Sequence, residues 1–125
     1  MDSELSKGSF DVKLHGDLAV IIPSPNVENM PETLIQPAAE LVLAPLRKNP
    51  PSGVVIDLSK VQFFGSAFIS FLLKCHLLAK THGCEVVLAG ASERIRELLN
   101  VTALNTLWAL YDSPGEALEA LGGSD

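Results

Sequence analysis

Two short apolar runs in the middle of the chain constrain its fold more than any other feature. Gly53–Leu58 is apolar and largely β-branched up to Asp57, and Glu85–Ala89 repeats the pattern. Runs of this kind are typical of parallel strands that are covered by helices on both faces of a sheet. Neighbouring parallel strands need a crossover connection, which is usually a helix. The two runs therefore predict an α/β fold.

The rest of the chain supplies the helices and the outer strands. Phe10–Ile22 alternates, pauses and then continues as an apolar stretch, which predicts a β-hairpin. Pro31–Lys48 has helical spacing, but two internal prolines interrupt it, so we expect a kinked helix or a short turn followed by a helix. The remaining predicted elements are a helix over Ser66–Thr81, a helix capped by Ser92 and ending at Leu99, a strand over Leu107–Tyr111 and a helix that opens at Ser113 and ends near Leu121.

This order of elements predicts a single domain. Strands that alternate with helices imply a mainly parallel, mixed β-sheet, here with an N-terminal hairpin strand and about four helices. A chain of 125 residues, 47% of them apolar, is long enough for one hydrophobic core and not for two. We expect the domain to cover residues 9–121, with flexible ends at 1–8 and 122–125.

Charge and targeting signals argue against several classes of function. The net charge of -6 opposes non-specific binding to nucleic acid or to anionic lipid, because both need a basic surface. The first residues lack the basic region and apolar block of a signal peptide, and no segment has the character of a membrane span. Cys75 and Cys84 have the spacing of neither a disulfide framework nor a zinc site, which favours a reduced, cytoplasmic setting.

Ser66 is the strongest candidate for a functional residue, because a predicted strand, a glycine turn and a predicted helix meet there. A serine that opens a helix places its hydroxyl near free backbone N–H groups and the positive end of the helix dipole, which favour an anion. Ser66 is therefore either a phosphate acceptor or simply the helix N-cap, which stabilises a helix by ~1 kcal/mol. Asp57, at the end of a buried strand, is either a polar group near Ser66 or the cap of a turn.

Beyond the serine, the segments that carry a family signature are Val55–Val61, Val86–Gly90 and Leu98–Leu107. Together with Ser66 they resemble the STAS domain, which sulphate transporters share with bacterial anti-sigma factor antagonists. In that family a short buried strand leads through Asp-Ser-Ser-Gly into a long helix, and the acceptor serine falls on Ser66. The chain departs from this signature at the three other positions, where it has Gly65, Ala67 and Phe68.

The resemblance implies an anti-sigma factor antagonist rather than an enzyme. In this family a kinase that is also an anti-sigma factor phosphorylates the serine. The unphosphorylated domain sequesters that kinase and frees the sigma factor, and a phosphatase resets the domain. No cofactor is implied. The alternative is a scaffold or accessory subunit of a signalling complex or transporter that works without phosphorylation, and a weak homodimer is left open.

The resemblance and the helix pattern together give the partner-binding candidates Asp57, Gly65, Ser66, Ala67, Phe68 and Phe71. The helix after Ser66 has more apolar residues than one buried face can hold, and they form two stripes. The stripe expected to face the sheet contains Ile69, Leu72, Leu73, His76 and Ala79. The second stripe contains Phe68, Phe71, Cys75 and Leu78. We expect Phe68 to be exposed for docking, unless the second stripe packs against the helix that begins after Ser92.

Catalysis and metal binding have little support in the sequence. A serine hydrolase needs a G-x-S-x-G elbow, whereas the residue two positions after Ser66 is not glycine, and His76 on the same helix is roughly 15 Å away. The cysteines and histidines between residues 75 and 84 lack ligand spacing, so no metal site is expected. Neither G-x-G-x-x-G nor G-x-x-x-x-G-K-[ST] occurs, which argues against nucleotide binding.

Overall fold

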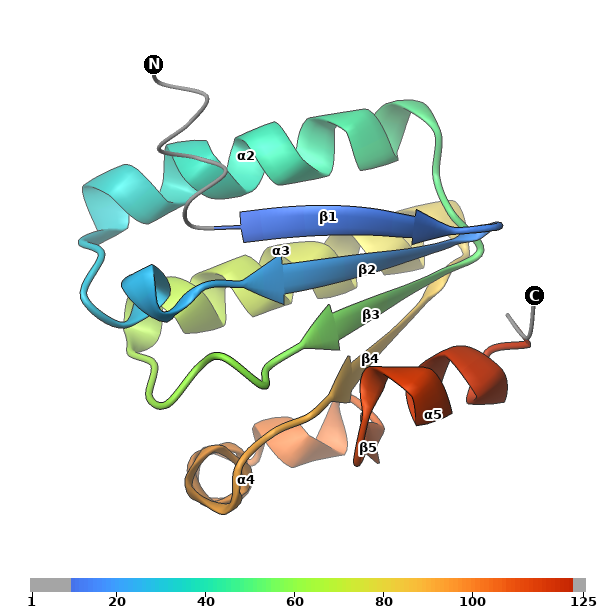
Figure 1. The fold of residues 1–125 in the computed structure, drawn as a ribbon. Helices are drawn as coiled ribbons and strands as arrows, with labels where there is room; N and C mark the ends of the chain where they lie inside the picture. Colours follow the sequence, from blue (N-terminus) through green and yellow to red (C-terminus); the bar gives the residue numbers. More distant parts are fainter. Residues whose placement is uncertain (1–9, 123–125) are drawn as a thin grey trace.

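A five-stranded mixed sheet forms the middle layer of the molecule, with its strands in the spatial order β1-β2-β3-β4-β5 (Figure 1). The computed structural model describes residues 10–122, so the expected flexible ends at 1–8 and 122–125 lie outside the described residues, apart from Gly122. The strands are β1 (Phe10–His15), β2 (Leu18–Pro23), β3 (Gly53–Asp57), β4 (Glu85–Ala89) and β5 (Leu110–Tyr111). β1 is antiparallel to β2 and the other neighbours are parallel, which confirms the predicted mixed sheet with an N-terminal hairpin.

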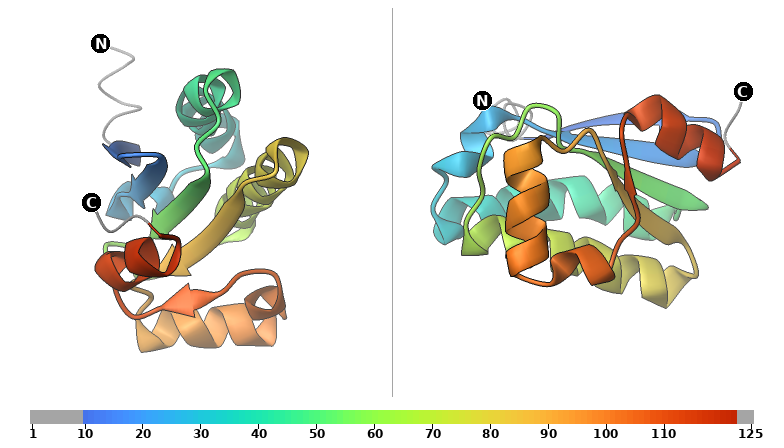
Figure 2. Two further views of the ribbon diagram at one scale, coloured as in Figure 1. Left: turned by 90° about the vertical axis from the view of Figure 1, so that its right-hand side faces the viewer. Right: turned by 90° about the horizontal axis from the view of Figure 1, so that it is seen from below.

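Four α-helices of the described chain cover the two faces of this sheet, as predicted. The helices are α2 (Glu32–Lys48), α3 (Ser66–His82), α4 (Glu93–Val101) and α5 (Pro114–Ala120), and the short 3₁₀ helices are η1 (Pro25–Glu28) and η2 (Leu104–Thr106). α2 and α3 lie side by side on one face, while α5 packs on the other face against β3, β4 and β5 (Figure 2). α4 contributes Ile95 and Leu99 to the core on the α2–α3 side.

Alternation along the inner strands divides the core into two clusters. In β3, Val54 and Ile56 belong to the larger cluster beneath α2 and α3, while Val55 belongs to the smaller cluster beneath α5. β4 alternates in the same way, with Leu88 in the larger cluster and Val87 in the smaller one. All residues of β3 are buried, as expected for a strand that helices cover on both faces.

Local signals in the sequence set the ends of three helices. Gly83 ends α3 with a φ of +70°, a left-handed conformation that glycine adopts without strain. The hydroxyl of Ser92 accepts a hydrogen bond from the N–H group of Ile95 over 3.2 Å and caps α4. The hydroxyl of Ser113 accepts from the N–H group of Glu116 over 3.2 Å and caps α5.

α2 is a single helix through Pro37 and Pro45, so the alternative of a short turn followed by a helix over this range is wrong. Each proline deprives the carbonyl group four residues earlier of its helical hydrogen bond. These carbonyl groups belong to Thr33 and Leu41, which are exposed, so that water can satisfy them. The helix therefore continues where the sequence alone indicated an interruption.

The last strand is shorter than predicted, because β5 covers Leu110–Tyr111 rather than Leu107–Tyr111. Its pairing partners on β4 are Leu88 and Ala89, at the end of that strand. Trp108 turns into the core instead and is 4% exposed. The first part of the apolar run Leu107–Tyr111 thus contributes Trp108 to the core and does not form a strand.

Replacing Ile56 by alanine tests the burial of β3 beneath α2 and α3. The side chain is fully buried in the larger cluster. We expect Ile56→Ala to lower the free energy of unfolding by about 2–5 kcal/mol, measured by urea denaturation. The control is Leu77→Ala on the outer side of α3, where the side chain is 67% exposed and the change should stay within about 0.5 kcal/mol. Equal losses in the two variants would contradict this description of the core.

Candidate functional site

The connection from β3 to α3 is anchored by apolar residues that alternate with polar ones. Leu58, Val61 and Phe64 are buried in the larger core cluster, and the residues between them are mostly exposed. The N–H group of Leu58 donates to the carbonyl group of Ala89 over 2.8 Å, which extends the sheet pairing just beyond β3. The position at which α3 begins is therefore set by the core beneath the loop.

Asp57 caps the turn that follows β3. It is 9% exposed, and its Oδ1 atom accepts a hydrogen bond from the N–H group of Ser59 over 3.0 Å. Gly90 lies against this carboxylate, since a Cβ atom there would be 2.9 Å from Oδ1, and its φ is +72°. No hydrogen bond joins Asp57 to Ser66 within residues 10–122. Of the two roles considered for Asp57, the structure shows turn capping.

Ser66 is the first residue of α3, and Gly65 rather than Ser66 is the N-cap residue. The alternative that Ser66 is simply the helix N-cap is therefore wrong. The carbonyl group of Gly65 already accepts from the N–H group of Ile69 over 3.1 Å, which places Gly65 at the boundary of the helix. Ser66 is exposed, and the N–H groups of this first turn have no partners within the helix. Its hydroxyl is accessible to another protein at the positive end of the helix dipole.

Phe68 and Phe71 are fully buried, so the expectation that Phe68 is exposed for docking is wrong. The ring centroids of Phe64 and Phe68 lie 5.6 Å apart, those of Phe68 and Phe71 5.6 Å apart, and those of Phe71 and Phe10 4.6 Å apart. These four rings form an aromatic cluster beneath the start of α3. Neither Phe68 nor Phe71 can touch a partner while this cluster is intact.

The buried face of α3 differs from the predicted one. Its buried residues are Phe68, Phe71, Leu72, Cys75 and Ala79. Leu73 is 42% exposed, and Ile69 and His76 lie at the flank. Both stripes have the spacing of a helix face, and the helix is rotated so that the two phenylalanines, which have the larger apolar surface, are removed from water.

The exposed surface beside Ser66 contains an aromatic residue that the sequence analysis missed. Phe63 is 42% exposed, and the guanidinium carbon of Arg94 lies 5.8 Å from the centre of its ring. The N–H group of the neighbouring Gln62 donates to a carboxylate oxygen of Glu28 over 2.9 Å. Phe63 and Phe64 are adjacent in an extended loop, where successive side chains point to opposite sides. Since Phe64 is buried, this alternation could have indicated from the sequence that Phe63 is exposed.

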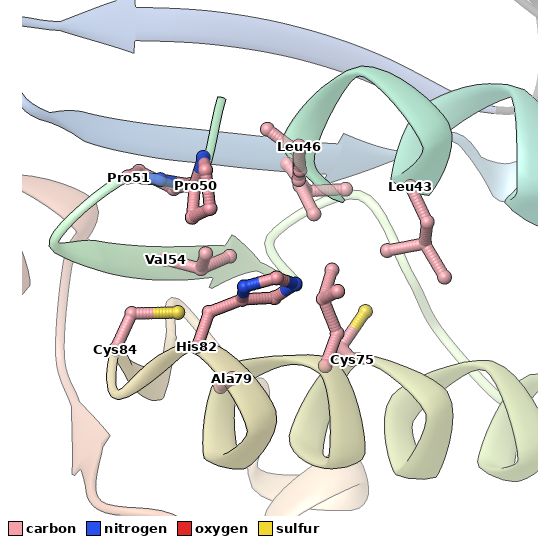
Figure 3. A pocket seen from close by; sticks show the side chains of 11 residues that line it. Leu43, Leu46, Pro50, Pro51, Val54, Cys75, Ala79, His82 and Cys84 are labelled. Atoms are coloured by element: carbon pink, nitrogen blue, oxygen red, sulfur yellow. The ribbon is translucent and has the colours of Figure 1, made fainter. Parts of the chain in front are cut away.

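The narrow pocket shown in Figure 3 lies between α2 and the C-terminal half of α3. Cys75, His82 and Cys84 line it among apolar side chains. Its volume of about 10 Å³ is close to the space that one water molecule needs and far below that of a ligand site. Burial raises the pKa of the Cys75 thiol to about 12 and also raises the pKa of Cys84, so both thiols are protonated at neutral pH.

The described residues contain neither a metal-binding cluster nor a membrane-spanning helix. No group of three or more histidine, cysteine, aspartate or glutamate side chains within residues 10–122 could hold a metal ion. None of the helices in the same range has the length and apolar character needed to cross a membrane. The start of α3, with its exposed serine, remains the candidate functional site.

Comparison with known proteins decides the family. The model of the STAS domain matches residues 16–117, which include every strand from β2 to β5. The chain belongs to the STAS domain family. No curated protein matches it in sequence. The resemblance to the STAS domain is thereby confirmed.

Solved structures with the same fold include anti-sigma factor antagonists. An anti-sigma-factor antagonist (STAS) domain protein from Planctomyces limnophilus is 30% identical, with a TM-score of 0.76 over 90% of this chain and 96% of that chain. An anti-sigma factor antagonist from Mycobacterium paratuberculosis is 25% identical, with a TM-score of 0.70 over 90% and 92% of the two chains. The Bacillus cell-fate determinant SpoIIAA in its phosphorylated form is similar in fold, with 11% identity and a TM-score of 0.67 over 90% and 98%.

Truncation of Phe68 tests whether this residue is core or contact surface. We expect Phe68→Ala to lower the free energy of unfolding by about 3–5 kcal/mol, because it removes a ring from a packed cluster. Phe63→Ala is the matched control, since it removes the same side chain from the surface of the same segment, and its cost should be about 0.5 kcal/mol or less. Urea denaturation of both variants measures the difference. A small loss in Phe68→Ala would return Phe68 to the surface candidates.

Restoring the family aspartate at position 65 tests how α3 begins. Gly65 has a φ of -114°, and nothing lies within 4 Å of a Cβ atom built there. A carboxylate at this N-cap could accept N–H groups of the first turn, so we expect Gly65→Asp to raise the free energy of unfolding by about 0.5 kcal/mol. The control is Gly83→Asp at the other end of α3, where the left-handed backbone and the helix dipole should make the change cost about 1 kcal/mol or more. Destabilisation by Gly65→Asp would show that the turn requires glycine.

Proposed function

We propose that this domain is an anti-sigma factor antagonist whose binding is controlled by phosphorylation of Ser66. The observation that carries the proposal is the position of this serine, which is exposed at the first turn of α3 above a buried aromatic cluster. The Planctomyces limnophilus relative, 30% identical, supports the proposal because it is described as an anti-sigma-factor antagonist domain protein. The similarity in fold to phosphorylated SpoIIAA is consistent with it.

A phosphate on Ser66 would act through its charge. It would add about -1.5 to -2 charges at pH 7 at a helix end whose N–H groups and dipole favour an anion. Phe68 and Phe71 lie directly beneath and are fully buried, so the surface should change its potential while keeping its shape. A partner that fits the unmodified surface would then meet an uncompensated negative charge.

The proposed contact surface is smaller than the set of residues named from the sequence. Gly65, Ser66 and Ala67 reach the surface, and the exposed ring of Phe63 extends it. The other three residues support this surface from below. Asp57 fixes the turn after β3. Phe68 and Phe71 hold the start of α3 in place.

The proposed partner is an anti-sigma factor that is also a serine kinase, and both would meet in the cytoplasm. Capture of this kinase by the unphosphorylated domain would free a sigma factor. A phosphatase would remove the phosphate from Ser66 and so restore the form of the domain that captures the kinase. These partners are those that the resemblance to anti-sigma factor antagonists implies, and no binding to nucleic acid is proposed, in keeping with the net charge of -6.

The test is phosphorylation by the cognate kinase with ATP, followed by mass spectrometry of the intact domain and of its peptides. We expect one phosphate, on Ser66, and none on the Ser66→Ala variant. Ser70→Ala is the matched control, because Ser70 lies on the same helix one turn further on and should leave phosphorylation unchanged. A phosphate at another position, or none at all, would remove Ser66 as the switch.

A binding measurement separates the switch from a scaffold. We expect Ser66→Asp to keep the far-UV circular dichroism spectrum of the native domain and to bind the kinase at least tenfold more weakly, a change of about 1.4 kcal/mol. Binding of the native strength by both Ser66→Asp and the phosphorylated domain would favour the alternative, a scaffold that works without phosphorylation.

A further inference from the structure

β1 is one of the two outer strands of the sheet, and no strand within residues 10–122 pairs with its far edge. Among the described strands it pairs with β2 alone, in an unbroken register that runs from Phe10–Pro23 to His15–Leu18. Every residue of β1 after Phe10 is exposed, and Leu14 is 71% exposed. The strand has no proline or bulge to protect this edge, and its charged side chains are those of Asp11 and Lys13. An edge of this kind is a template for pairing with another strand.

The hairpin loop decides which backbone groups face this outer edge. Gly16 and Asp17 form a two-residue loop, so the closing pair His15–Leu18 exchanges both backbone hydrogen bonds. Bonded and non-bonded pairs alternate along an antiparallel ladder, so the odd-numbered residues of β1 bond to β2. On the other side of β2 the carbonyl group of Asp17 accepts from the N–H group of Ser52 over 2.9 Å, as this alternation requires. The even-numbered residues of β1 therefore direct their N–H and C=O groups outwards.

The side chains of β1 alternate between the two faces of the sheet. Val12 stands opposite Ile21, which belongs to the core cluster beneath α2, so the even-numbered residues lie on the α2 side. Asp11 and Lys13 lie on the opposite face. β1 thus carries apolar side chains on one face and two charges of opposite sign on the other.

α2 continues the apolar surface of this edge. Leu43 and Arg47 line a surface hollow together with Leu77 of α3, so this flank of α2 faces α3. At about 100° per residue, Leu34 and Leu41 lie on the opposite flank, towards the β1 side of the sheet. Leu34 is 57% exposed and Leu41 is 56% exposed. The outer edge is therefore bordered by exposed apolar side chains from two elements.

We propose that two copies of this chain associate through β1, antiparallel to each other and with the two-fold axis at Val12. Val12 then pairs with Val12 of the second copy, and Phe10 pairs with Leu14 of the second copy. The outward N–H and C=O groups of both strands become bonded, and the two sheets join into one. The exposed leucines of α2 come to the same side of the joined sheet as Val12 and Leu14 of β1.

Among axes at Asp11, Val12 and Lys13 of β1, the charges favour the axis at Val12. With the axis at Val12, Asp11 stands directly opposite Lys13 of the second copy on both sides of the axis. An axis at Asp11 would set two aspartates opposite each other, and an axis at Lys13 would set two lysines opposite each other, which is destabilising. An axis between two residues would oppose side chains from different faces, which an antiparallel sheet does not allow.

Charge reversal tests both the interface and its register. Asp11→Lys and Lys13→Asp each create like-charged pairs across the axis, and each should raise the dimer dissociation constant by about tenfold. The double variant Asp11→Lys/Lys13→Asp restores opposite charges and should recover the native constant, and a mixture of the two single variants should form the heterodimer in preference to either homodimer. Sedimentation equilibrium over a concentration series measures these constants. Glu97→Lys and Lys80→Asp make the same changes in charge at exposed positions away from β1 and should leave the constant unchanged.

Hydrogen exchange gives a second readout. The N–H groups of Val12 and Leu14 would be bonded only in the dimer, so their exchange should slow as the protein concentration rises. The N–H group of Lys13 is bonded to β2 in both states and serves as the internal control. A chain that stays monomeric at all concentrations, or a dimer that is insensitive to both charge reversals, would overturn the proposal. Concentration-dependent protection at another surface without protection of Val12 would overturn it as well.

Discussion

Burial of β3 on both faces is the constraint on which the rest of the structure depends. Its residues are all buried, and its backbone pairs with β2 on one side and β4 on the other. Two layers of helices are needed to remove such a strand from water, which explains α2 and α3 on one face and α5 on the other. The chain must then leave the sheet where β3 ends. Asp57 caps the turn at this point, and Gly90 lets the backbone of the neighbouring strand approach the Asp57 carboxylate closely. The start of α3 consequently reaches the surface at the carboxyl ends of the strands, where α/β folds place their sites.

The exposed serine stands on a rigid base. Beneath it, the rings of Phe10, Phe64, Phe68 and Phe71 pack against one another and against the sheet. Removing a ring from such a cluster costs about 3–5 kcal/mol, so the base of the site resists rearrangement. A site built in this way is suited to a switch in which the charge changes and the backbone does not.

The parts of the fold that local signals determine agree with the sequence analysis. The hairpin, the two buried strands and the helix ends at Gly83, Ser92 and Ser113 all depend on residues close together in the chain. The differences at α3 arise because the local sequence fitted two arrangements equally well. The first turn of α3 could begin at Gly65 or at Ser66, and either apolar stripe of α3 could face the sheet. Only contacts with distant residues, such as Phe10 against Phe71, separate these options.

By itself the sequence determined the order of the elements, the two-sided burial of the inner strands and the meeting of strand, glycine turn and helix at Ser66. Periodicity and capping are properties of neighbouring residues, so they are legible without a structure. The tertiary structure alone decided that Phe68 is core, that Phe63 meets Arg94 and that no other described strand pairs with the outer edge of β1. Each of these depends on which surfaces of distant segments come together to exclude water, and residue spacing within one segment does not encode that choice.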